Sequence, residues 1–396
     1  MERILIVHNS YQHPGGEDSV VEAERRMLTS RGHEVRVFLK TYTDLQNTPR
    51  WRVPLQSVWS RKTAAELRRN INEFRPDVVH FHNTFPLVSA GAYWTVCNAG
   101  IPVVQTLHNF RWLCSGAILY RNGRVCEDCI GKFPWRGALH GCYRNSRIQT
   151  IASLMSLGVH RMLGTLKSRV TLFIALNQFC RDKFIEGGLP SGKFRIKPNF
   201  LDGEPTVAQV PGTGGLFVGR LSKEKGIDVL AVAAAGLPPD SLKVIGGGDL
   251  EPLVREKFGD AFLGYLSLEE ILSQMRKASF LVIPSTCHEN FPRTIVEAFA
   301  SGIPVIASRI GAMAEIVEDQ VTGLLFEPGN AVDLATKLRW ALDHPLEMAV
   351  MGKNARMKYQ EKYTADINYN MLLEIYREAV FLFNAGKQPL SAAGVA

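Results

Sequence analysis

The sequence has no long hydrophobic run and no leader segment. None of its apolar stretches reaches the ~18 residues that a membrane-spanning helix needs, although the chain has 396 residues. Its first three residues lead directly into the apolar segment 4–7, so the pattern of a secretory signal peptide is missing. Low-complexity segments are also few. We therefore expect a globular protein of the cytoplasm, which would meet a membrane only peripherally, at its surface.

Signatures of nucleic-acid binding are also missing, although the charge would suit such a partner. Residues 1–201 hold 28 Lys and Arg against 14 Asp and Glu, whereas the remainder holds 18 against 24. A basic half of this kind suits nucleic acid, an anionic membrane face or an anionic substrate. The sequence contains no zinc-finger, helix-turn-helix or aromatic RNA-binding motif. We therefore predict no nucleic-acid partner and favour an anionic membrane surface.

The sequence does contain a regular alternation of strands and helices. Its length suits two domains rather than one. We expect strands at residues 4–7, 35–39, 77–82, 102–108, 171–176, 215–219, 242–245, 280–283, 304–308 and 324–326. Strands that alternate with helices predict an α/β fold with parallel, doubly wound sheets. We place a first domain at residues 1–200, a second at 201–366 and a final helix at 367–390.

One candidate site follows the expected strand 280–283. Glu289 lies in the loop at the carboxyl end of this strand, and Glu297 lies in the next helix. Ligands of open α/β sheets bind at this edge. The backbone N–H groups of Arg293 to Ile295 would open the helix and suit a phosphate. Two carboxylates beside an anion site fit a sugar joined to a nucleoside diphosphate, because hydroxyls need acceptors and phosphates need donors.

A second stretch, residues 219–226, places Arg220 and Lys225 after another short apolar strand and before another helix. Arg can contact two phosphate oxygens with its forked guanidinium, and Lys supplies a point charge. The alternative is an exposed charged turn, because Lys223 and Glu224 lie between them. A glycine run follows the expected strand 242–245, and its members Gly247 and Gly248 would let the backbone approach a nucleotide closely.

Together these motifs carry a resemblance to a known family. Glu289-x7-Glu297 with an upstream Gly-Arg-Leu-Ser-x-Glu-Lys-Gly resembles the retaining GT-B glycosyltransferases of family 4, and the resemblance covers nearly the whole chain. It implies two Rossmann-like domains that face each other across a cleft, with the last helix crossing back to the first domain. It also implies transfer of a hexose from a nucleoside diphosphate sugar to a hydroxyl acceptor with retained anomeric configuration.

The resemblance also assigns roles to residues. It implies that Glu289 contacts the transferred sugar and Glu297 the ribose. Donor contacts are further implied for Asn290, Phe291, Thr294 and Ile295. Pro292 departs from the family's usual glycine, so a backbone N–H contact is lost there. The chain has no Asp-x-Asp, the metal clamp of the other large glycosyltransferase fold, so we expect Arg220 and Lys225 to replace a catalytic metal and predict no cofactor for catalysis.

The acceptor is expected against the first domain. Gly15 and Gly16 follow its first strand and can approach the donor, and polar pairs follow two further strands: His82, Asn83, His108 and Asn109. A neutral histidine there could orient or deprotonate an acceptor hydroxyl. We favour His108, which matches the acceptor-side histidine of the resembled family, and read His80 as equally compatible with a structural role. The resemblance implies a saccharide acceptor, and we expect it to be lipid-linked, as in bacterial envelope polysaccharide synthesis.

Four cysteines form a separate pattern. Cys114, Cys126, Cys129 and Cys142 have the spacing C-x11-C-x2-C-x12-C in an insertion at about 110–145, with a hairpin turn expected at 121–124. In a reducing compartment this spacing suggests a structural zinc site rather than disulfides. The alternative is a set of buried free cysteines.

Residues 50–62 mix basic side chains with Trp51 and Trp59, a combination favoured at lipid interfaces. Both tryptophans could instead pack inward. Two other functions stay open: a nucleotide-sugar epimerase or hydrolase of the same fold, and a zinc-containing nucleic-acid-binding protein. The sequence does not identify the base, the sugar or the acceptor.

Overall fold

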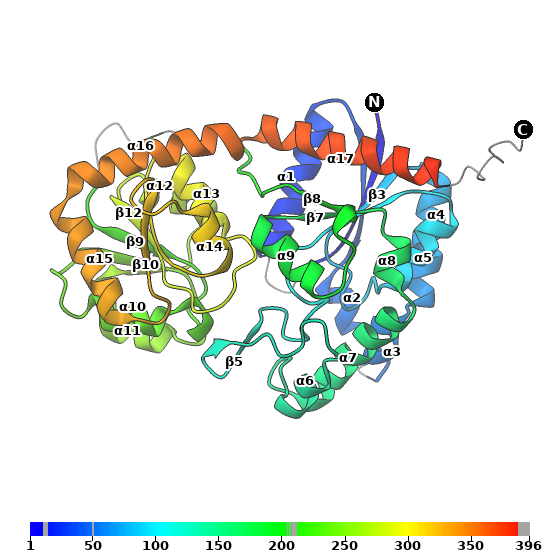
Figure 1. The fold of residues 1–396 in the computed structure, drawn as a ribbon, viewed down its shortest axis with the longest axis horizontal. Coiled ribbons are helices and arrows are strands. Elements are labelled where there is room, and N and C mark those ends of the chain that lie inside the picture. The colour runs from blue at the N-terminus through cyan, green and yellow to red at the C-terminus, as the bar shows by residue number, and fades with distance from the viewer. Residues whose placement is uncertain (11–14, 50, 204, 206, 208–211, 387–396) are drawn as a thin grey trace, which may run out of the picture.

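The computed structural model describes residues 1–10, 15–49, 51–203, 205, 207 and 212–386, and it contains two parallel six-stranded sheets. Figure 1 shows them side by side, each covered by helices on both faces. The first sheet has the order β2-β1-β3-β4-β7-β8 and the second β11-β10-β9-β12-β13-β14. All pairings within the two sheets are parallel. The predicted two-domain, Rossmann-like GT-B architecture is therefore confirmed.

The first sheet carries the amino-terminal half of the chain. Its strands are β1 (Arg3–Asn9), β2 (Glu34–Lys40), β3 (Val78–Phe81), β4 (Val103–Thr106), β7 (Leu172–Ala175) and β8 (Phe194–Ile196). The helices of this half are α1 (Gly16–Ser30), α2 (Tyr42–Gln46), α3 (Val53–Val58), α4 (Arg61–Phe74), α5 (Gly91–Asn98), α6 (Trp135–His140), α7 (Arg147–Met162), α8 (Thr165–Arg169) and α9 (Gln178–Glu186), with the short helix η1 (Ser191–Lys193).

The second sheet carries most of the remaining chain. Its strands are β9 (Gly215–Val218), β10 (Leu242–Ile245), β11 (Phe262–Gly264), β12 (Phe280–Ile283), β13 (Val305–Ser308) and β14 (Gly323–Phe326). Its helices are η2 (Lys223–Lys225), α10 (Ile227–Ala234), α11 (Glu251–Phe258), η3 (Gly259–Ala261), α12 (Leu268–Met275), α13 (Arg293–Ala300), α14 (Gly311–Ile316), α15 (Ala331–Asp343) and α16 (Pro345–Lys362).

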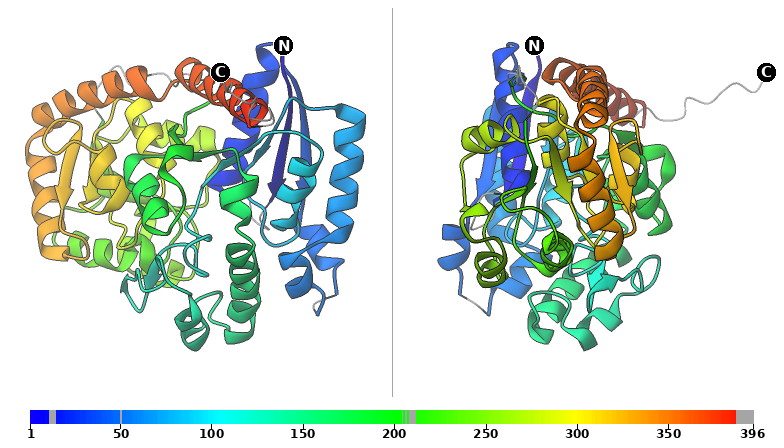
Figure 2. Two further views of the ribbon diagram at one scale, coloured as in Figure 1. Left: turned by 45° about the vertical axis from the view of Figure 1, so that its right-hand side comes forward. Right: turned by 90° about the vertical axis from the view of Figure 1, so that its left-hand side faces the viewer.

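The last described helix, α17 (Ala365–Ala385), crosses back to the first domain, as Figures 1 and 2 show. It packs on α1, β3 and β4. Two ion pairs anchor it there: Asp366 with Arg31, and Glu378 with Arg195. Residues 387–390 of the expected final helix lie outside the described residues. None of the described helices combines the length and apolarity needed to cross a bilayer.

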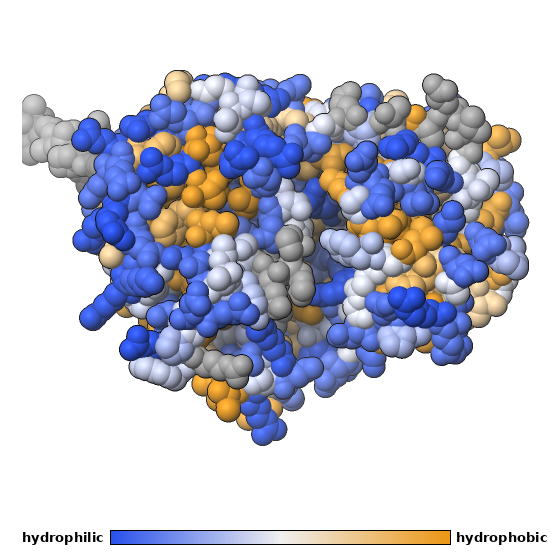
Figure 3. All heavy atoms as spheres, turned by 180° about the vertical axis from the view of Figure 1, so that it is seen from behind, coloured by the Kyte–Doolittle hydropathy of each residue, from blue (hydrophilic) through white to orange (hydrophobic). Residues whose placement is uncertain are grey.

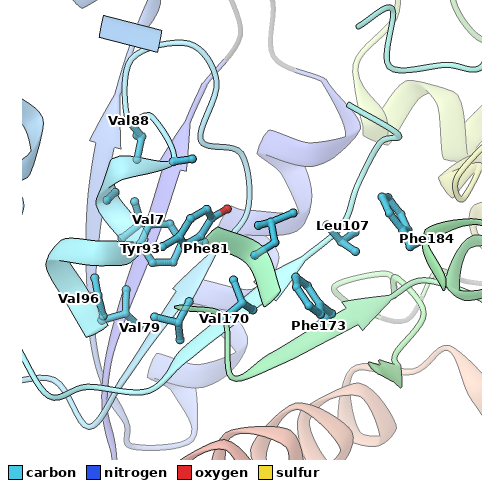
Figure 4. Packing of buried hydrophobic residues seen from close by; sticks show 14 of the residues in the cluster. Val7, Val79, Phe81, Val88, Tyr93, Val96, Leu107, Val170, Phe173 and Phe184 are labelled. Atoms are coloured by element: carbon cyan, nitrogen blue, oxygen red, sulfur yellow. The ribbon is translucent and has the colours of Figure 1, made fainter. Parts of the chain in front are cut away.

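The core explains why the strands are easy to recognise. β3 and β4 are fully buried, and their β-branched and aromatic side chains suit the pleated surface of a covered parallel sheet. Figure 4 shows Val79 and Phe81 of β3 packed with Tyr93 and Val96 of α5 on one face of the first sheet. Strand side chains alternate between faces. His80 and His82 therefore point to the opposite face, on which α1 and α17 pack.

Two strands, β8 and β11, were not expected. Each has three residues and lies at the edge of its sheet, so the segment is too short for a clear strand pattern. The hairpin turn expected at 121–124 is confirmed, because β5 (Tyr120–Arg121) pairs antiparallel with β6 (Arg124–Val125). We propose that the first domain ends near residue 200, in the connection between β8 and β9.

Candidate active site

Each sheet has a switch point, where consecutive connections leave in opposite directions, and ligands of open α/β sheets bind at such points. In the first sheet it lies between β1 and β3, whose carboxyl ends carry His8 and His82. In the second sheet it lies between β9 and β12, which lead to Arg220 and Glu289. The predicted site segments therefore follow the strands that border the two switch points.

At the second switch point, Lys225 and Glu289 form the central contact. Lys225 Nζ lies 2.6 Å from Glu289 Oε1, and the Ser285 hydroxyl donates to the same oxygen at 2.7 Å. Burial acts to lower the pKa of Lys225, but the Glu289 carboxylate outweighs it and the pKa is raised. Lys225 is therefore a permanent cation beside a carboxylate that is fixed in direction.

A glycine allows this approach. Gly226 follows Lys225 with φ +68°, and a Cβ there would lie 1.9 Å from the carbonyl oxygen of Pro284. Any larger residue would push the Lys225 turn away from the end of β12. Arg220 lies nearby but turns outward: its side chain is 60% exposed and pairs with Glu224. The fold thus fixes Lys225 beside Glu289, whereas Arg220 lies at the rim of the site, where it pairs with Glu224.

The amino terminus of α13 lies opposite that of α1. A Cβ on Gly16 would lie 3.7 Å from the Arg293 side chain, so the glycine loop of the first domain reaches the helix start of the second. Arg293 lies 3.7 Å from Glu297, which is buried. Burial raises the pKa of Glu297, and Arg293 opposes that shift. The space-filling view in Figure 3 shows the surface hollowed between the two domains.

Several predicted donor residues have other structural tasks. Phe291 and Ile295 point into the hydrophobic core of the second domain, so only their backbone could meet a donor. The Asn290 side chain donates to the carbonyl of Leu107 across the domain boundary at 2.8 Å. Thr294 stays half-exposed at the start of α13. Donor contacts from Phe291 and Ile295 would therefore come from the backbone, whereas Asn290 keeps a side-chain oxygen without a partner among the described residues, and all three contacts stay predictions.

In the glycine loop after β10, Gly247 has open space beside it, whereas Gly248 does not. A Cβ on Gly247 would meet nothing within 4 Å, whereas one on Gly248 would lie 2.6 Å from the Leu221 carbonyl oxygen. Gly247 is therefore open to the surroundings. Gly248 is required by the close approach of the neighbouring Arg220 loop.

In the first domain, His82 and His108 form a buried pair. His82 Nδ1 lies 2.8 Å from His108 Nε2, and the rings stack with an interplanar angle of 17°. Burial lowers the pKa of both histidines, well below the usual range for His108. Both line a small pocket of about 40 Å³ together with Asn83 and Asn109. Two neutral imidazoles therefore sit where the acceptor was expected.

The side-chain amides of Asn83 and Asn109, beside these histidines, mainly form hydrogen bonds to neighbouring loops and helices. Asn83 donates to the Asn9 carbonyl at 2.9 Å and accepts from the Phe85 N–H at 3.0 Å. Asn109 donates to Glu17 at 2.6 Å, which ties it to the start of α1. His80 bonds Tyr376 and Thr106 through its two ring nitrogens at 2.8 and 2.7 Å. His80 therefore has the structural role that the sequence left open.

A larger groove of about 710 Å³ adjoins the histidine pocket. It lies between α3 and α7, and the two cavities share Ser57, Phe85 and Arg111. The Arg111 guanidinium lies over the rings of Phe85 and Tyr143 at 4.7 and 5.1 Å. The groove thus combines apolar walls with a cation, and part of the segment 50–62 lines it.

The cysteine-rich insertion contacts the second domain. The Thr286 hydroxyl donates to the Tyr120 hydroxyl at 3.1 Å, and His288 lies 3.0 Å from Glu127. On the far side of the boundary, Glu315 accepts from the Gln178 and Phe179 N–H groups at the start of α9. The segment around Glu289 is therefore held from two sides by the first domain.

The four cysteines of the predicted zinc site lie near enough to one another to interact electrostatically. No three of the four cysteine sulfurs lie within 4.8 Å of one another, and all four thiols are free. Burial, together with the neighbouring cysteines, raises the pKa of the Cys114 and Cys142 thiols, and that of Cys129 to about 11; a bound Zn²⁺ would oppose this shift by stabilising the thiolates. Cys114 and Cys129 are buried and Cys126 and Cys142 are partly exposed, and the zinc site stays a prediction.

Some residues of the site escaped the sequence analysis. Arg293 was considered only for its backbone, and Glu24 and Lys197 were not considered at all. Glu24 had a usable signal, because it lies among the apolar positions of α1 that face the core. Lys197 had none, because its partner is 173 residues away.

Two protein families match the chain. The family described as "Glycosyltransferase Family 4" matches residues 14–204, and the family described as "Glycosyl transferases group 1" matches residues 215–358. An uncharacterized glycosyltransferase of Methanocaldococcus jannaschii is 34% identical over 170 residues, which are 41% of this chain and 48% of that protein. A sulfoquinovosyl transferase of Arabidopsis thaliana is 26% identical over 324 residues, which are 79% and 58%. The chain thus spans about half the length of these relatives.

Solved structures agree on the fold over almost the full chain. HepE of Anabaena in complex with UDP has a TM-score of 0.67 at 18% identity and covers 95% of this chain and 100% of its own. A sucrose-phosphate synthase of Thermosynechococcus elongatus has a TM-score of 0.69 at 18% identity, with coverage of 97% and 100%. With the two family matches and the two parallel domains, these findings show that the chain belongs to the GT-B glycosyltransferases of the family 4 type.

Proposed function

We propose that this protein transfers a hexose from a nucleoside diphosphate sugar to a hydroxyl of a lipid-linked saccharide, with retained configuration and without a catalytic metal. The observation that carries the proposal is the contact of Lys225 with Glu289 at the switch point between β9 and β12. A cation and a carboxylate held together there suit a ligand with phosphates at one end and hydroxyls at the other.

The donor would place its diphosphate between Lys225 and the amino terminus of α13. Lys225 is a permanent cation, and Arg220 at the rim can swing inward from Glu224. The helix start adds backbone N–H groups and the positive end of its dipole. These fixed charges would stabilise the departing diphosphate in place of a metal ion. Glu289 would then accept from the sugar hydroxyls, and Glu297 from the ribose.

The comparisons support a nucleotide donor. HepE of Anabaena has been solved with UDP and with UDP-glucose, and its fold matches this chain over both domains. We extend only the class of ligand to this protein: a nucleoside diphosphate sugar bound mainly by the second domain.

Retention is proposed from the resemblance to the retaining family 4 glycosyltransferases, and Glu289 is proposed to bind sugar hydroxyls rather than to act as a nucleophile. Its Oε1 is occupied by both Lys225 and Ser285, and these contacts hold electron density on the carboxylate. We infer attack from the same face as the leaving group. The acceptor oxygen bonds to the sugar carbon, the phosphate oxygen leaves with the bonding electrons, and the acceptor proton passes to that phosphate oxygen. His108 would orient the acceptor hydroxyl.

The groove between α3 and α7 would hold the acceptor. Its aromatic and aliphatic walls suit an apolar chain, and Arg111 and Arg144 suit a phosphate. The shared lining with the histidine pocket would bring the acceptor's sugar to His108. This combination favours a saccharide carried on a lipid phosphate over a free sugar.

The surface beside the groove suits a membrane. α6 and α3 both pack on α7, and these helices expose large apolar side chains: Leu55, Trp135, Leu139, Ile148, Ile151 and Met155. We call this set the apolar tip; Figure 3 shows apolar atoms at the lower end of the first domain, where Figure 1 places α6. Exposed basic residues flank it: Arg52, Arg136 and Arg147. We propose peripheral binding to an anionic membrane through this tip.

The two tryptophans of the expected membrane segment behave differently. Trp51 is 67% exposed, whereas Trp59 is 40% exposed and stacks on His160. A Cβ on Gly91 would lie 2.9 Å from the Trp59 ring, so this tryptophan partly packs inward. Arg50 of the same segment lies outside the described residues. The membrane proposal therefore rests on the apolar tip more than on the segment 50–62.

A donor screen tests the function. Thermal unfolding should be measured with UDP-, GDP- and ADP-sugars, because a donor at 100 times its Kd stabilises the native state by ~2.7 kcal/mol. The stabilising donor is then incubated with and without lipid-linked saccharides. Transfer only in their presence supports the proposal. Release of free sugar or an isomer without any acceptor would instead identify a hydrolase or epimerase.

A further inference from the structure

A buried charged cluster lies beneath the histidine pair, and the proposed reaction does not yet use it. Glu24 of α1, His80 and His82 at β3 and Lys197 after β8 are all buried. Lys197 Nζ lies 2.8 Å from Glu24 Oε1 and 2.9 Å from Asn368 Oδ1 of α17. Such a group of charges inside a domain is costly unless each member is paired.

Glu24 is ionised in this cluster. Burial acts to raise its pKa, but Lys197 and the adjacent His82 together hold the pKa well below its usual range. An ionised carboxylate has acceptors and no donor. Whatever faces Glu24 must therefore present a hydrogen.

The cluster could be taken for a metal site, since ligand atoms of Glu24, His80 and His82 lie within 4.8 Å of one another. Its hydrogen bonds argue against this. Both ring nitrogens of His80 already have partners, Tyr376 and Thr106. The Lys197 ammonium already neutralises Glu24. A divalent ion would have to displace these contacts beside a buried cation.

The second oxygen of Glu24 points at His82 instead. Glu24 Oε2 and His82 Nε2 lie 3.4 Å apart. Both atoms are buried, and neither has another hydrogen-bond partner among the described residues. A buried acceptor and a buried nitrogen left facing each other satisfy one another only if His82 carries its hydrogen on Nε2.

This fixes the hydrogens along a chain of three side chains. A neutral His82 with Nε2–H has a lone pair on Nδ1, which lies 2.8 Å from His108 Nε2. His108 must then donate from Nε2, so its Nδ1 carries the lone pair. No hydrogen bond to His108 Nδ1 is found in the part of the chain that the structure describes, and His108 lines the small pocket.

We propose that Glu24 is a positioning residue that sets the tautomers of His82 and His108, so that His108 offers an unprotonated Nδ1 to the acceptor hydroxyl. This rests on the proposed function for the identity of the hydroxyl, but not for the tautomers. The hydroxyl donates to Nδ1, which directs its oxygen toward the sugar carbon. As the new bond forms, the proton moves to Nδ1 and from there to the departing phosphate oxygen, so His108 ends the reaction neutral.

Other titratable groups surround the pair. His8 lies with its ring centroid 6.2 Å from that of His82, and its Nε2 lies 3.0 Å from Asp18. His80 lies 4.2 Å from His82 by the same measure, and Tyr376 of α17 packs behind it. Lys197 completes the set. None of these neighbours takes the place of Glu24 at His82 Nε2, so the carboxylate is the group that decides the tautomer.

Nuclear magnetic resonance tests the proposal on the wild-type protein. Long-range ¹H–¹⁵N correlations of ¹⁵N-histidine-labelled protein at pH 7.5 distinguish the two neutral tautomers, and His82→Gln and His108→Gln assign the signals. We expect the Nε2–H tautomer for both residues. An Nδ1–H tautomer at either residue would overturn the proposal. This measurement needs no activity, so it stands apart from failure of the proposed function.

The Glu24→Gln variant provides the second test, with Glu378→Gln as its control. Glu378 of α17 also forms an ion pair with the first domain, through Arg195 of β8, but it lies away from the histidines. Glu24→Gln should mix the His108 tautomers and lower the kcat for acceptor-dependent transfer about 10²-fold, with the donor KM unchanged. The control should change neither. A fall in kcat with unaltered tautomers would overturn the proposal, because Glu24 would then affect the rate by another route.

Discussion

The sharpest prediction concerns Lys225→Ala. The substitution removes a cation that lies 2.6 Å from Glu289 and is 28% exposed. Loss of one hydrogen bond to a charged group costs roughly 1.5–3 kcal/mol. Each 1.4 kcal/mol is a factor of ten, so the Kd for a nucleoside diphosphate should rise about 10- to 150-fold. The upper half of this range is expected, because Glu289 without its cation repels the diphosphate.

Isothermal titration with two ligands separates the explanations. The nucleoside diphosphate should bind more weakly to Lys225→Ala, whereas the matching nucleoside without phosphates should bind as it does to wild type. Lys223→Ala is the matched control, because Lys223 lies exposed in the same short helix, η2, and should leave both affinities unchanged. Equal weakening of nucleoside and nucleoside diphosphate would refute the reasoning, since it would mean that Lys225 supports the fold and not the phosphates.

Three further predictions follow from other parts of the molecule. Turnover should persist when EDTA is added shortly before the assay, because Lys225 and Arg220 are proposed to stabilise the leaving group; an immediate loss that Mg²⁺ restores would contradict this. The free energy of unfolding, measured in urea, should fall as the pH drops below about 6.5, because burial lowers the pKa of His80 and His108 and only the unfolded chain takes up their protons there. The His80→Gln substitution should make the free energy of unfolding less dependent on pH. An unchanged slope would contradict the role given to His80. Co-sedimentation with anionic liposomes should be salt-reversible and should decrease on charge reversal at Arg52, Arg136 and Arg147, with donor affinity intact; equal binding to neutral liposomes would refute the electrostatic part.

The positions of most strands and of Lys225 and Glu289 could be predicted from the sequence alone. Buried parallel strands are continuous apolar runs, so their ends are visible without a structure. Residues that follow those ends must gather at one edge of a parallel sheet. The placement of Lys225 and Glu289 therefore needed only local patterns, although their 2.6 Å contact needed the fold.

Other features depend on which segments the tertiary structure brings together. Asn290 and Phe291 are next to Glu289 in sequence, yet one bridges the domains and the other fills a core, because helix packing decides where each side chain points. The four cysteines have a zinc-like spacing, but only the fold of the insertion brings them near one another.

The histidine pair and the buried charged cluster beneath it show the same difference between local pattern and tertiary contact. His82 and His108 were recognisable as strand-end residues, because that depends on local pattern. Glu24 and Lys197 are 173 residues apart, and their contact exists only because α1, β3 and the segment after β8 meet on one face of the first sheet. Local patterns were enough to predict which side chains reach the edges of the sheets. The tertiary structure decided which of them meet, because contacts between distant segments are set by packing and not by local pattern.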